Sequence, residues 1–317
     1  MPKKKEEEPP FVVLTGSQGL IGSHVAAQLL RDGHGVVGVD NEEKYGDIEL
    51  PHEATDNWFF YSGEIGRSGL RLLLSWASGR LSWEKTESII ACAGLIDGRG
   101  FSRNLPHTVG RRNAGIDLET TGFISRIKEH SPSVNVVYLS NGEAGESLYR
   151  DLAEELGVSL AIIRPFSCTG IPGDYHVIPD LVRRAFILEK GDEFPIHGSG
   201  EQARFFTHAE DVARAVTLCR EKGRETPGWN ETFDISSSVA TQIKDVAKIV
   251  WSKIHGEEPQ LKNLPPYNKD VECSPSPDTT KARDMLGFVA EKSIEDIIGD
   301  CIDALKPQEE AEEAEEE

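Results

Sequence analysis

Long hydrophobic runs are absent from this sequence of 317 residues. No apolar stretch approaches the ~20 residues that a membrane-spanning helix requires, so we expect no membrane partner. The opening segment, MPKKKEEEPP, also lacks the apolar centre of a secretory signal. We therefore predict a cytoplasmic protein whose residues 1–10 form a disordered leader. A nuclear-import patch in the lysines of this leader is the less favoured alternative.

Metal-binding and disulfide motifs are absent too. The five cysteines are scattered without a C-x-x-C spacing, and the nine histidines include no H-E-x-x-H motif. The sequence therefore predicts no metal site and no disulfide framework. Reduced thiols, as in other cytosolic proteins, are the expected state of these cysteines.

Positive charge is scarce. The chain has 34 lysines and arginines against 54 aspartates and glutamates, which gives a net charge of −20. Seven of the glutamates fall in the closing stretch PQEEAEEAEEE, and such a block of like charge predicts a disordered acidic tail over residues 306–317. An acidic surface repels a phosphate backbone, so nucleic acid is an unlikely partner.

Apolar strands alternate with amphipathic helices in the first half of the chain. Runs such as FVVLTG, GVVGVD, SIIACAG and NVVYLS carry no regular polar alternation, which is typical of parallel strands buried on both faces. The pattern predicts the doubly wound α/β class, with a Rossmann-type parallel sheet over residues 11–165. After residue 165 the regular alternation of strands and helices ends. We expect residues 166–305 to form a smaller C-terminal substrate lobe that is mixed with sheet elements of the first domain.

A glycine-rich turn follows the first predicted strand. The segment LTGSQGLIGSH places Gly16, Gly19 and Gly22 in a G-x-x-G-x-x-G spacing between a strand and a helix. Such a turn lets a pyrophosphate approach the backbone at a helix N-terminus. Asp40 ends the second strand, where a carboxylate accepts hydrogen bonds from ribose hydroxyls. No arginine stands there to bind a 2′-phosphate, so the sequence predicts NAD rather than NADP. A glycine-rich turn selected only for packing is the alternative.

With these segments the sequence resembles the extended short-chain dehydrogenase/reductase family, in particular its NAD-dependent nucleotide-sugar epimerase/dehydratase branch. The resemblance covers about residues 11–305 and includes the segments SGEI, IIACAG, IIRPFSCTGIPG and IHGSGEQARFFTHAEDVARAV. It implies NAD as the cofactor, a nucleotide sugar as the ligand and a homodimer. The residues that it places around the cofactor are Gly16, Ser17, Gln18, Gly19, Leu20, Ile21, Gly22, Asp40, Asn41, Glu64, Ile65, Cys92, Ala93 and Gly94.

The chemistry that the resemblance implies is a transient oxidation. Bound NAD takes a hydride from a sugar carbon, usually C4, and the resulting ketone permits epimerisation, dehydration or decarboxylation. The base is a tyrosine in a Y-x-x-x-K motif, because a lysine one helical turn away lowers the pKa of the tyrosine. The resemblance also implies Asn113 as a site residue and Arg204 as the arginine that grips the nucleotide diphosphate.

The Y-x-x-x-K motif has no counterpart in this chain. Tyr149 falls in the expected segment, but Ala153 stands four residues after it. An unsupported phenol with a pKa of ~10 is a poor base at neutral pH, so packing is the favoured interpretation of Tyr149. The carboxylates of Glu143 and Glu146 are alternative bases, although acids that complement a helix dipole are common at such positions. The catalytic candidates are therefore Tyr149, Glu143 and Asn113.

Basic residues gather after the fourth predicted strand, in the segment GLIDGRGFSRNLPHTVGRRN. Ligands bind at the carboxyl edge of such sheets, where a cluster of arginines is suited to phosphates or a carboxylate. An ordinary solvated loop explains the cluster equally well. Its members are Arg99, Arg103, His107, Arg111 and Arg112. The expected substrate contacts are Arg204, Arg99, Arg103 and His176.

Three functions remain open from the sequence. The first is an enzyme that acts on a nucleotide sugar with NAD and non-standard catalytic residues. The second is a catalytically degenerate family member that serves as a binding, regulatory or scaffold protein. The third is an RNA-binding offshoot, which the net charge disfavours unless the arginine-rich segment is a local site.

Overall fold

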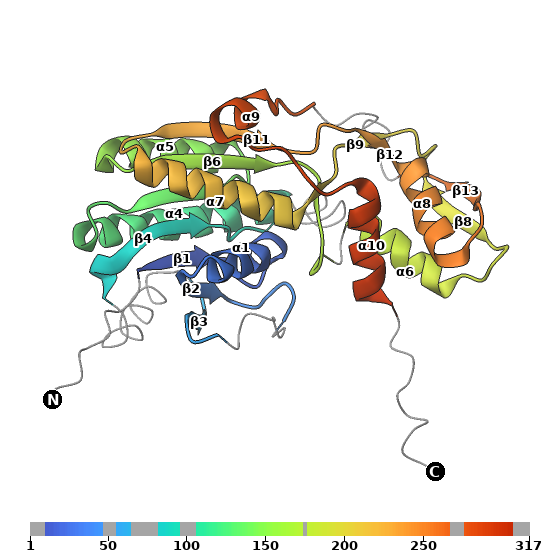
Figure 1. Cartoon of the computed structure of the whole chain (residues 1–317), viewed down its shortest axis with the longest axis horizontal. Coiled ribbons are helices and arrows are strands. Elements are labelled where there is room, and N and C mark those ends of the chain that lie inside the picture. The colour runs from blue at the N-terminus through green and yellow to red at the C-terminus, as the bar shows by residue number, and fades with distance from the viewer. Residues whose placement is uncertain are drawn as a thin grey trace, which may run out of the picture.

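The computed structural model describes residues 10–46, 55–64, 82–95, 106–173, 176–266 and 276–306. Its central strands are β1 (Phe11–Thr15), β2 (Gly35–Asp40), β3 (Trp58–Ser62), β4 (Thr86–Ala91), β5 (Asn135–Leu139), β6 (Leu160–Pro165) and β11 (Asn230–Ile235). They form a seven-stranded sheet in the order β11-β6-β5-β4-β1-β2-β3, and every neighbouring pair is parallel (Figure 1). The predicted Rossmann-type, doubly wound α/β class is confirmed.

Helices cover both faces of this sheet. One layer contains α1 (Leu20–Arg31), α7 (Ala209–Glu225) and α9 (Thr280–Leu286), and the other contains α4 (Pro106–His130) and α5 (Glu143–Leu156). Strand β1 shows why both layers form, because Val12 packs with the first layer and Val13 with the second. Successive side chains of a strand point to opposite faces, so an uninterrupted apolar strand is buried only between two layers.

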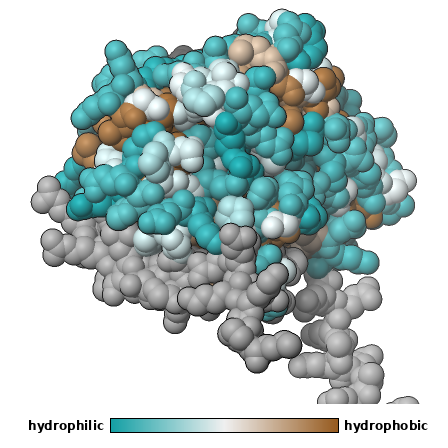
Figure 2. Space-filling model, turned by 60° about the vertical axis from the view of Figure 1, so that its left-hand side comes forward, coloured by the Kyte–Doolittle hydropathy of each residue, from teal (hydrophilic) through white to brown (hydrophobic). Residues whose placement is uncertain are grey.

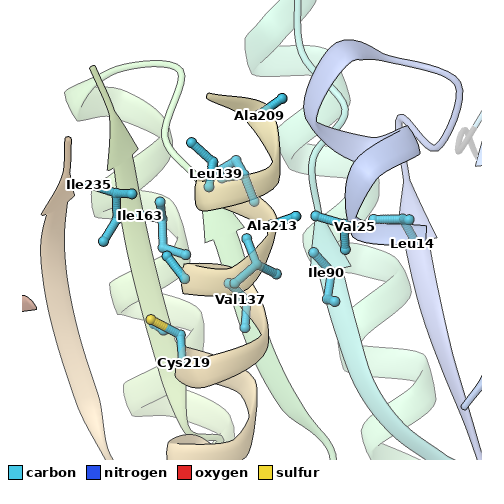
Figure 3. Close-up of a cluster of buried hydrophobic side chains, with 14 of the residues drawn as sticks. Leu14, Val25, Ile90, Val137, Leu139, Ile163, Ala209, Ala213, Cys219 and Ile235 are labelled. Carbon is cyan, nitrogen blue, oxygen red and sulfur yellow. The ribbon is translucent and has the colours of Figure 1, made fainter. Parts of the chain in front are cut away.

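Helix α7 packs closely on the middle of the sheet. Its inward face carries Ala209, Ala213 and Cys219, whose small side chains lie over the branched side chains of the strands, among them Val137 and Ile163 (Figure 3). All of these residues are buried. The short side chains allow the helix axis to approach the sheet, as dense packing of a core requires.

A second group of elements stands beside the sheet (Figure 1). It contains α6 (Val177–Ile187), α8 (Ile243–His255), α10 (Ile294–Leu305) and the parallel strands β8 (Glu193–His197) and β13 (Gln260–Leu264). Their apolar side chains form a separate core cluster, in which the rings of Phe194 and Trp251 lie 4.9 Å apart between centroids. This group is referred to below as the C-terminal lobe.

The chain passes between the sheet and the C-terminal lobe more than once. After β8 it returns to the sheet as α7 and β11, and then re-enters the lobe as α8. Short strand pairs stand at the crossings: β7 (Cys168–Thr169) with β10 (Thr207–His208), and β9 (Ala203–Arg204) with β12 (Thr241–Gln242). The predicted domain boundaries at residues 165 and 305 stay predictions. The predicted leader and acidic tail lie almost wholly outside the described residues.

The surface is mostly polar where it can be seen. Figure 2 shows a largely hydrophilic face on which hydrophobic residues stand in separate groups. Large exposed apolar side chains in the described part of the chain include Leu118 on α4 and Ile187 at the end of α6. None of the helices within the described ranges combines the length and the hydropathy that crossing a bilayer requires.

Candidate nucleotide site at the carboxyl edge of the sheet

The glycine-rich turn joins β1 to α1 at the carboxyl edge of the sheet. Gly16 has a φ of +68°, and a Cβ added there would lie 2.8 Å from the backbone of Ala93. A Cβ at Gly22 would lie 2.0 Å from the carbonyl oxygen of Gly16, so only glycine lets α1 begin this close to the turn. The N-cap of α1 is Gly19, which has no side chain to cover the first amides of the helix. These features fit an anion bound at a helix N-terminus, as a pyrophosphate would be.

Asp40 closes β2 beside this turn. Its carboxylate accepts hydrogen bonds from the amide of Gln18 at 2.9 Å and from the amide of Glu42 at 2.8 Å. Burial raises the pKa of Asp40, and both amide donors oppose that shift. Each carboxylate oxygen keeps a further lone pair, so Asp40 can accept from a ribose hydroxyl while it holds the turn in place. Glu42 and Glu43 follow after Asn41. Glu43 is paired with Arg112, which the sequence reasoning did not place here, so Glu42 is the acidic side chain that disfavours the 2′-phosphate of NADP.

The predicted cofactor residues around this turn differ in how far their side chains are exposed. Ser17 and Gln18 are buried, so a cofactor in the turn would meet their main chain rather than their side chains. Asn41 is exposed, and its side-chain oxygen accepts from the amide of Glu43 at 3.2 Å. Glu64 is exposed after β3. Ile65, the next predicted cofactor residue, lies outside the described residues, whereas the predicted Leu20 and Ile21 open α1.

The segment that leaves β4 is fixed against the same edge. The amide of Ala93 donates to Oγ1 of Thr15 at 3.1 Å, which ties the segment to the end of β1. Asn113 of α4 holds Leu95 by both ends of its amide, because its Oδ1 accepts from the Leu95 amide at 2.7 Å and its Nδ2 donates to the Leu95 carbonyl at 3.1 Å. Burial raises the pKa of the Cys92 thiol, which disfavours its thiolate form at neutral pH.

A polar cluster occupies the carboxyl end of β5. The hydroxyl of Tyr138 lies 2.9 Å from Asn141 Oδ1 and 3.3 Å from Asp117 Oδ2. The amide nitrogen of Asn141 donates to Asp117 Oδ2 at 3.2 Å. Asp117 stands on α4 one turn after Asn113 and is 2% exposed, and this burial raises the pKa of its carboxyl group. The Asp117–Tyr138–Asn141 cluster was not predicted, because its members are scattered over two elements and a loop.

Tyr149 lies on the inner face of α5 and is a core residue. Its ring is 1% exposed and stacks on that of Tyr138 with centroids 3.9 Å apart. Burial raises the pKa of Tyr149 well above its ordinary value, and the charge of Asp117 raises it further. A general base must instead reach its substrate and hold a pKa near the working pH. The position of Tyr149 therefore agrees with the packing interpretation, and its predicted catalytic role stays a prediction.

Glu146 connects α5 to β6. Its carboxylate accepts from Arg164 at 2.6 Å, from Arg150 at 2.9 Å and from the hydroxyl of Ser140 at 2.7 Å. These contacts, chiefly those with Arg164, lower the pKa of Glu146 to about 2. A carboxylate held this firmly in its charged form is a structural ion pair rather than a base. Glu143, in contrast, is exposed in the first turn of α5, so its predicted catalytic role stays a prediction.

The basic segment after β4 is partly helical. His107, Arg111 and Arg112 belong to α4, which begins at Pro106, and not to a loop as the sequence suggested. Proline suits the first position of a helix, so this start could have been recognised. Arg112 makes a bidentate ion pair with Glu43, the residue that follows β2. The remaining members of the predicted cluster, Arg99 and Arg103, lie outside the described residues.

The C-terminal lobe supplies the other predicted contacts. Arg204 is half-buried in β9, where it pairs with Thr241 of β12, and its guanidinium donates to the carbonyl of Ala203 at 2.7 Å. His176 is the N-cap residue of α6 and is also half-buried. Both stand in segments that border the crossing between the sheet and the lobe. Their contact with a substrate stays a prediction.

Residues 12–140 and 124–235 match the family described as "NAD dependent epimerase/dehydratase family". The chain belongs to this family. The resemblance inferred from the sequence is confirmed at this level, and so is NAD as the cofactor of the family. The missing Y-x-x-x-K motif is a property of the sequence, and its consequence for activity is a separate question.

Individual relatives of this epimerase/dehydratase chain are distant. The UDP-N-acetyl-alpha-D-glucosaminuronate decarboxylase of Bacillus cytotoxicus is 24% identical over 307 residues, which cover 87% of this chain and 91% of the relative. The crystal structure of UDP-glucose 4-epimerase from Thermotoga maritima with UDP-glucose has a TM-score of 0.71 at 23% identity, and the match covers 92% of this chain and 97% of that one. UDP-glucose 4-epimerase from Bifidobacterium longum, in complex with NAD+ and UDP, gives 0.71 at 17% identity with the same coverage. At these identities the structures show a shared fold.

Proposed function

We propose that this member of the epimerase/dehydratase family binds NAD along the carboxyl edge of its sheet. The observation that carries the proposal is the joint geometry of the glycine-rich turn and Asp40. Gly16 and Gly22 let the turn close against the backbone of Ala93 and against the start of α1, which leaves the N-terminus of α1 for the pyrophosphate, and the Asp40 carboxylate stands at the ribose end of the same turn. Glu42 supports NAD over NADP, whereas the charge of Glu43 is compensated by its ion pair with Arg112.

The second ligand of the proposal is a nucleotide sugar, with UDP as the favoured nucleotide. Support comes from the relatives, since the named decarboxylase and both named epimerases act on or bind UDP compounds. Arg204 and His176 are the described residues of the C-terminal lobe that would contact this ligand. The sugar would then lie between the lobe and the edge formed by β4 and β5, where Gly94 and Asn141 stand.

For the reaction, we propose an atypical site. The chain has no Y-x-x-x-K motif, and its Tyr149 is buried with a raised pKa. Hydride exchange with a nucleotide sugar would have to use another proton acceptor, of which the exposed Glu143 is the candidate on α5. The second candidate function is a catalytically degenerate protein that binds both ligands without turnover. The burial of Tyr149 favours this second candidate, and Tyr138, whose hydroxyl lies at the carboxyl end of β5, is fully buried as well.

Two measurements on cofactor-stripped protein test these proposals. Calorimetry with NAD, NADP and UDP reports on binding, and we expect NAD to bind more tightly than NADP and UDP to bind to the NAD-loaded protein. NADH absorbance and product analysis with UDP-glucose and UDP-glucuronic acid report on turnover. Turnover that Glu143→Gln abolishes supports the atypical enzyme, and tight binding without NADH or product supports the degenerate protein. Absence of heat with both NAD and UDP contradicts the proposed function as a whole.

The assembly and location also stay proposals. A homodimer is supported by α4, a sheet-flanking helix on which Leu118 is 60% exposed. Light scattering after size-exclusion chromatography should give the mass of a dimer, and Leu118→Glu should reduce it to that of a monomer without loss of NAD binding. A dimeric mass that Leu118→Glu leaves unchanged would place the interface elsewhere. A cytoplasmic location rests on the sequence alone, and a fluorescent fusion would test it.

A further inference from the structure

An arginine from a distant helix stands close to the end of β2. Arg112 of α4 donates to both carboxylate oxygens of Glu43, with 2.6 Å between Nη1 of the arginine and Oε1 of the glutamate. Glu43 lies three residues after Asp40, the carboxylate that would accept the ribose hydroxyls. The sequence shows no arginine in the neighbourhood of Asp40, and the fold supplies one from 69 positions away.

The segment that carries Glu43 is tied to the Asp40 carboxylate. Glu42 has a left-handed φ of +57°, and its amide donates to Asp40 Oδ1 at 2.8 Å. The side chain of Asn41 accepts from the amide of Glu43 at 3.2 Å and donates to the Glu43 carboxylate at 3.4 Å. These contacts form a tight turn directly after β2. They hold the Glu43 carboxylate, and the guanidinium bound to it, at the ribose end of the candidate site.

A second acidic residue near Asp40 also acts on Arg112. The amide of Gly63 donates to the carbonyl oxygen of Asp40 at 2.7 Å, and Glu64 is the residue after Gly63. The hydrogen bonds to Glu43 raise the pKa of Arg112 most, and the charge of Glu64 raises it further. Arg112 is therefore close to both segments that border Asp40, the one after β2 and the one after β3.

The ion pair is open to solvent. The side chain of Arg112 is 37% exposed and that of Glu43 is 45% exposed. Exposed ion pairs contribute little to stability, so the guanidinium can exchange one anion for another without disturbing the fold. A phosphate is a suitable anion, because its oxygens accept two parallel hydrogen bonds from a guanidinium. In the wild type, however, a phosphate would have to displace Glu43, and the displaced carboxylate would then repel it.

We propose that Arg112 is an arginine able to bind the 2′-phosphate of NADP, and that Glu43 keeps it occupied and so withholds it from that phosphate. The inference rests on the proposed function, which places the ribose of the cofactor at Asp40. An arginine near this carboxylate is the group that accommodates a 2′-phosphate in dinucleotide sites. Glu42 stays beside Asp40 in any case, so releasing Arg112 should weaken the preference for NAD rather than reverse it.

A matched pair of ligands tests the inference. NAD and NADP differ only in the 2′-phosphate, and calorimetry on cofactor-stripped protein gives the dissociation constant of each. Glu43→Gln removes the charge and keeps the size of the side chain. We expect it to lower the ratio of the NADP to the NAD dissociation constant by roughly ten- to a hundredfold, because the released guanidinium gains charge-assisted hydrogen bonds to the phosphate.

Two further variants serve as controls. Glu193→Gln makes the same change in an exposed ion pair with Lys262 of the C-terminal lobe, and its ratio should equal that of the wild type. The double variant Glu43→Gln, Arg112→Gln carries the same net charge at this position as the wild-type pair, but it has no guanidinium to offer. We expect its ratio to return to that of the wild type. Thermal melting of each variant checks that it is folded.

The outcomes distinguish this inference from the proposed function. If NAD binds and Glu43→Gln leaves the ratio unchanged, the inference is overturned and the proposed function stands. The same holds if the double variant keeps the gain in NADP affinity, because the loss of a negative charge would then explain the gain without Arg112. A wild-type protein that binds NADP as tightly as NAD also overturns the inference. If the wild type and all variants bind neither dinucleotide, the proposed function itself fails.

Discussion

Tyr149 and Tyr138 form a stacked pair, with ring centroids 3.9 Å apart and ring planes inclined by 15°. Both rings are buried in the core between the sheet and the layer of α4 and α5. The pair places the tyrosine of α5 behind β5, away from the crevice at the carboxyl edge. The first turn of α5, which begins at Glu143 after the N-cap residue Gly142, is the part of this helix that would face the crevice.

Tyr149→Phe should therefore have little effect. We expect NAD affinity and any measurable hydride exchange to match the wild type, and the free energy of unfolding to fall by about 1 kcal/mol at most, because the hydrogen bond between the Tyr149 hydroxyl and the side chain of Thr120 is lost. Tyr149→Ala should lower the free energy of unfolding by about 3–5 kcal/mol, since it removes a buried ring. Urea denaturation measures both values. A phenylalanine variant that unfolds like the wild type but has lost turnover would show that Tyr149 is catalytic after all.

Gly22→Ala should weaken NAD binding more than any other alanine substitution in α1. Its Cβ would lie 2.0 Å from the carbonyl oxygen of Gly16, so the helix must move away from the turn. We expect at least a tenfold loss of NAD affinity and a loss of roughly 1–3 kcal/mol of stability.

Gly299→Ala is the control for this substitution, because a Cβ at Gly299 of α10 meets no atom within 4 Å. Its NAD affinity should equal that of the wild type, and its stability should rise slightly, since alanine favours the helix. Calorimetry and thermal melting compare the two variants. Equal NAD affinities of the two would remove the glycine-rich turn from the cofactor site.

Asp40→Asn should reduce NAD affinity by roughly tenfold. The new amide group faces the amide of Gln18 or of Glu42 with a donor, and one acceptor for the ribose is lost. Asp32→Asn makes the same change at an exposed position that follows α1, and should leave the affinity unaltered. Titration with NAD and with adenosine diphosphate ribose measures the loss. An Asp40→Asn variant that binds NAD like the wild type would place the ribose elsewhere.

The ion pairs of Glu146 should make stability fall in acid. The pKa of Glu146 is lowered from 4.5 to about 2 in the folded protein, so ionised Glu146 contributes its full stabilisation above pH 4.5. This stabilisation is lost as the pH falls from 4.5 towards 2. We expect the loss to be roughly 1–3 kcal/mol, because the side chains of Arg150 and Arg164 are partly exposed to solvent.

Urea denaturation over this pH range compares the wild type with Glu146→Gln. The variant should be less stable at neutral pH, and the difference between the two proteins should shrink as the pH falls. A difference that is independent of pH would mean that the charge of Glu146 does not stabilise the fold.

Local patterns in the sequence were sufficient to predict the parallel sheet and the glycine-rich turn. The apolar runs around Val12 and Val137 predict strands, because both faces of each strand had to be buried, and Gly16, Gly22 and Asp40 lie within one strand–helix–strand unit. The start of α4 at Pro106 was not predicted, although proline is common at the first position of a helix. Because this start was missed, Arg111 and Arg112 were assigned to a loop and not to the helix.

Local sequence patterns could not predict the contacts between elements that are distant in the chain. The Asp117–Tyr138–Asn141 cluster joins the middle of α4 to the end of β5, and nothing in the spacing of these residues points to their contact. The ion pair of Arg112 with Glu43 spans 69 positions of the chain. The burial of Tyr149 depends on the helical phase of α5, which begins close after β5.

The position of β11 has a consequence for the synthesis of the protein. This strand pairs with β6, yet the whole of α6, β8 and α7 is made between the two. On the ribosome, the hydrogen-bonding edge of β6 and the apolar surface that α7 later covers therefore emerge before their partners exist. Such an edge is open to pairing with other chains. Until β11 and α7 have been made, the nascent sheet therefore exposes an edge and an apolar surface on which intermolecular strand pairing can begin.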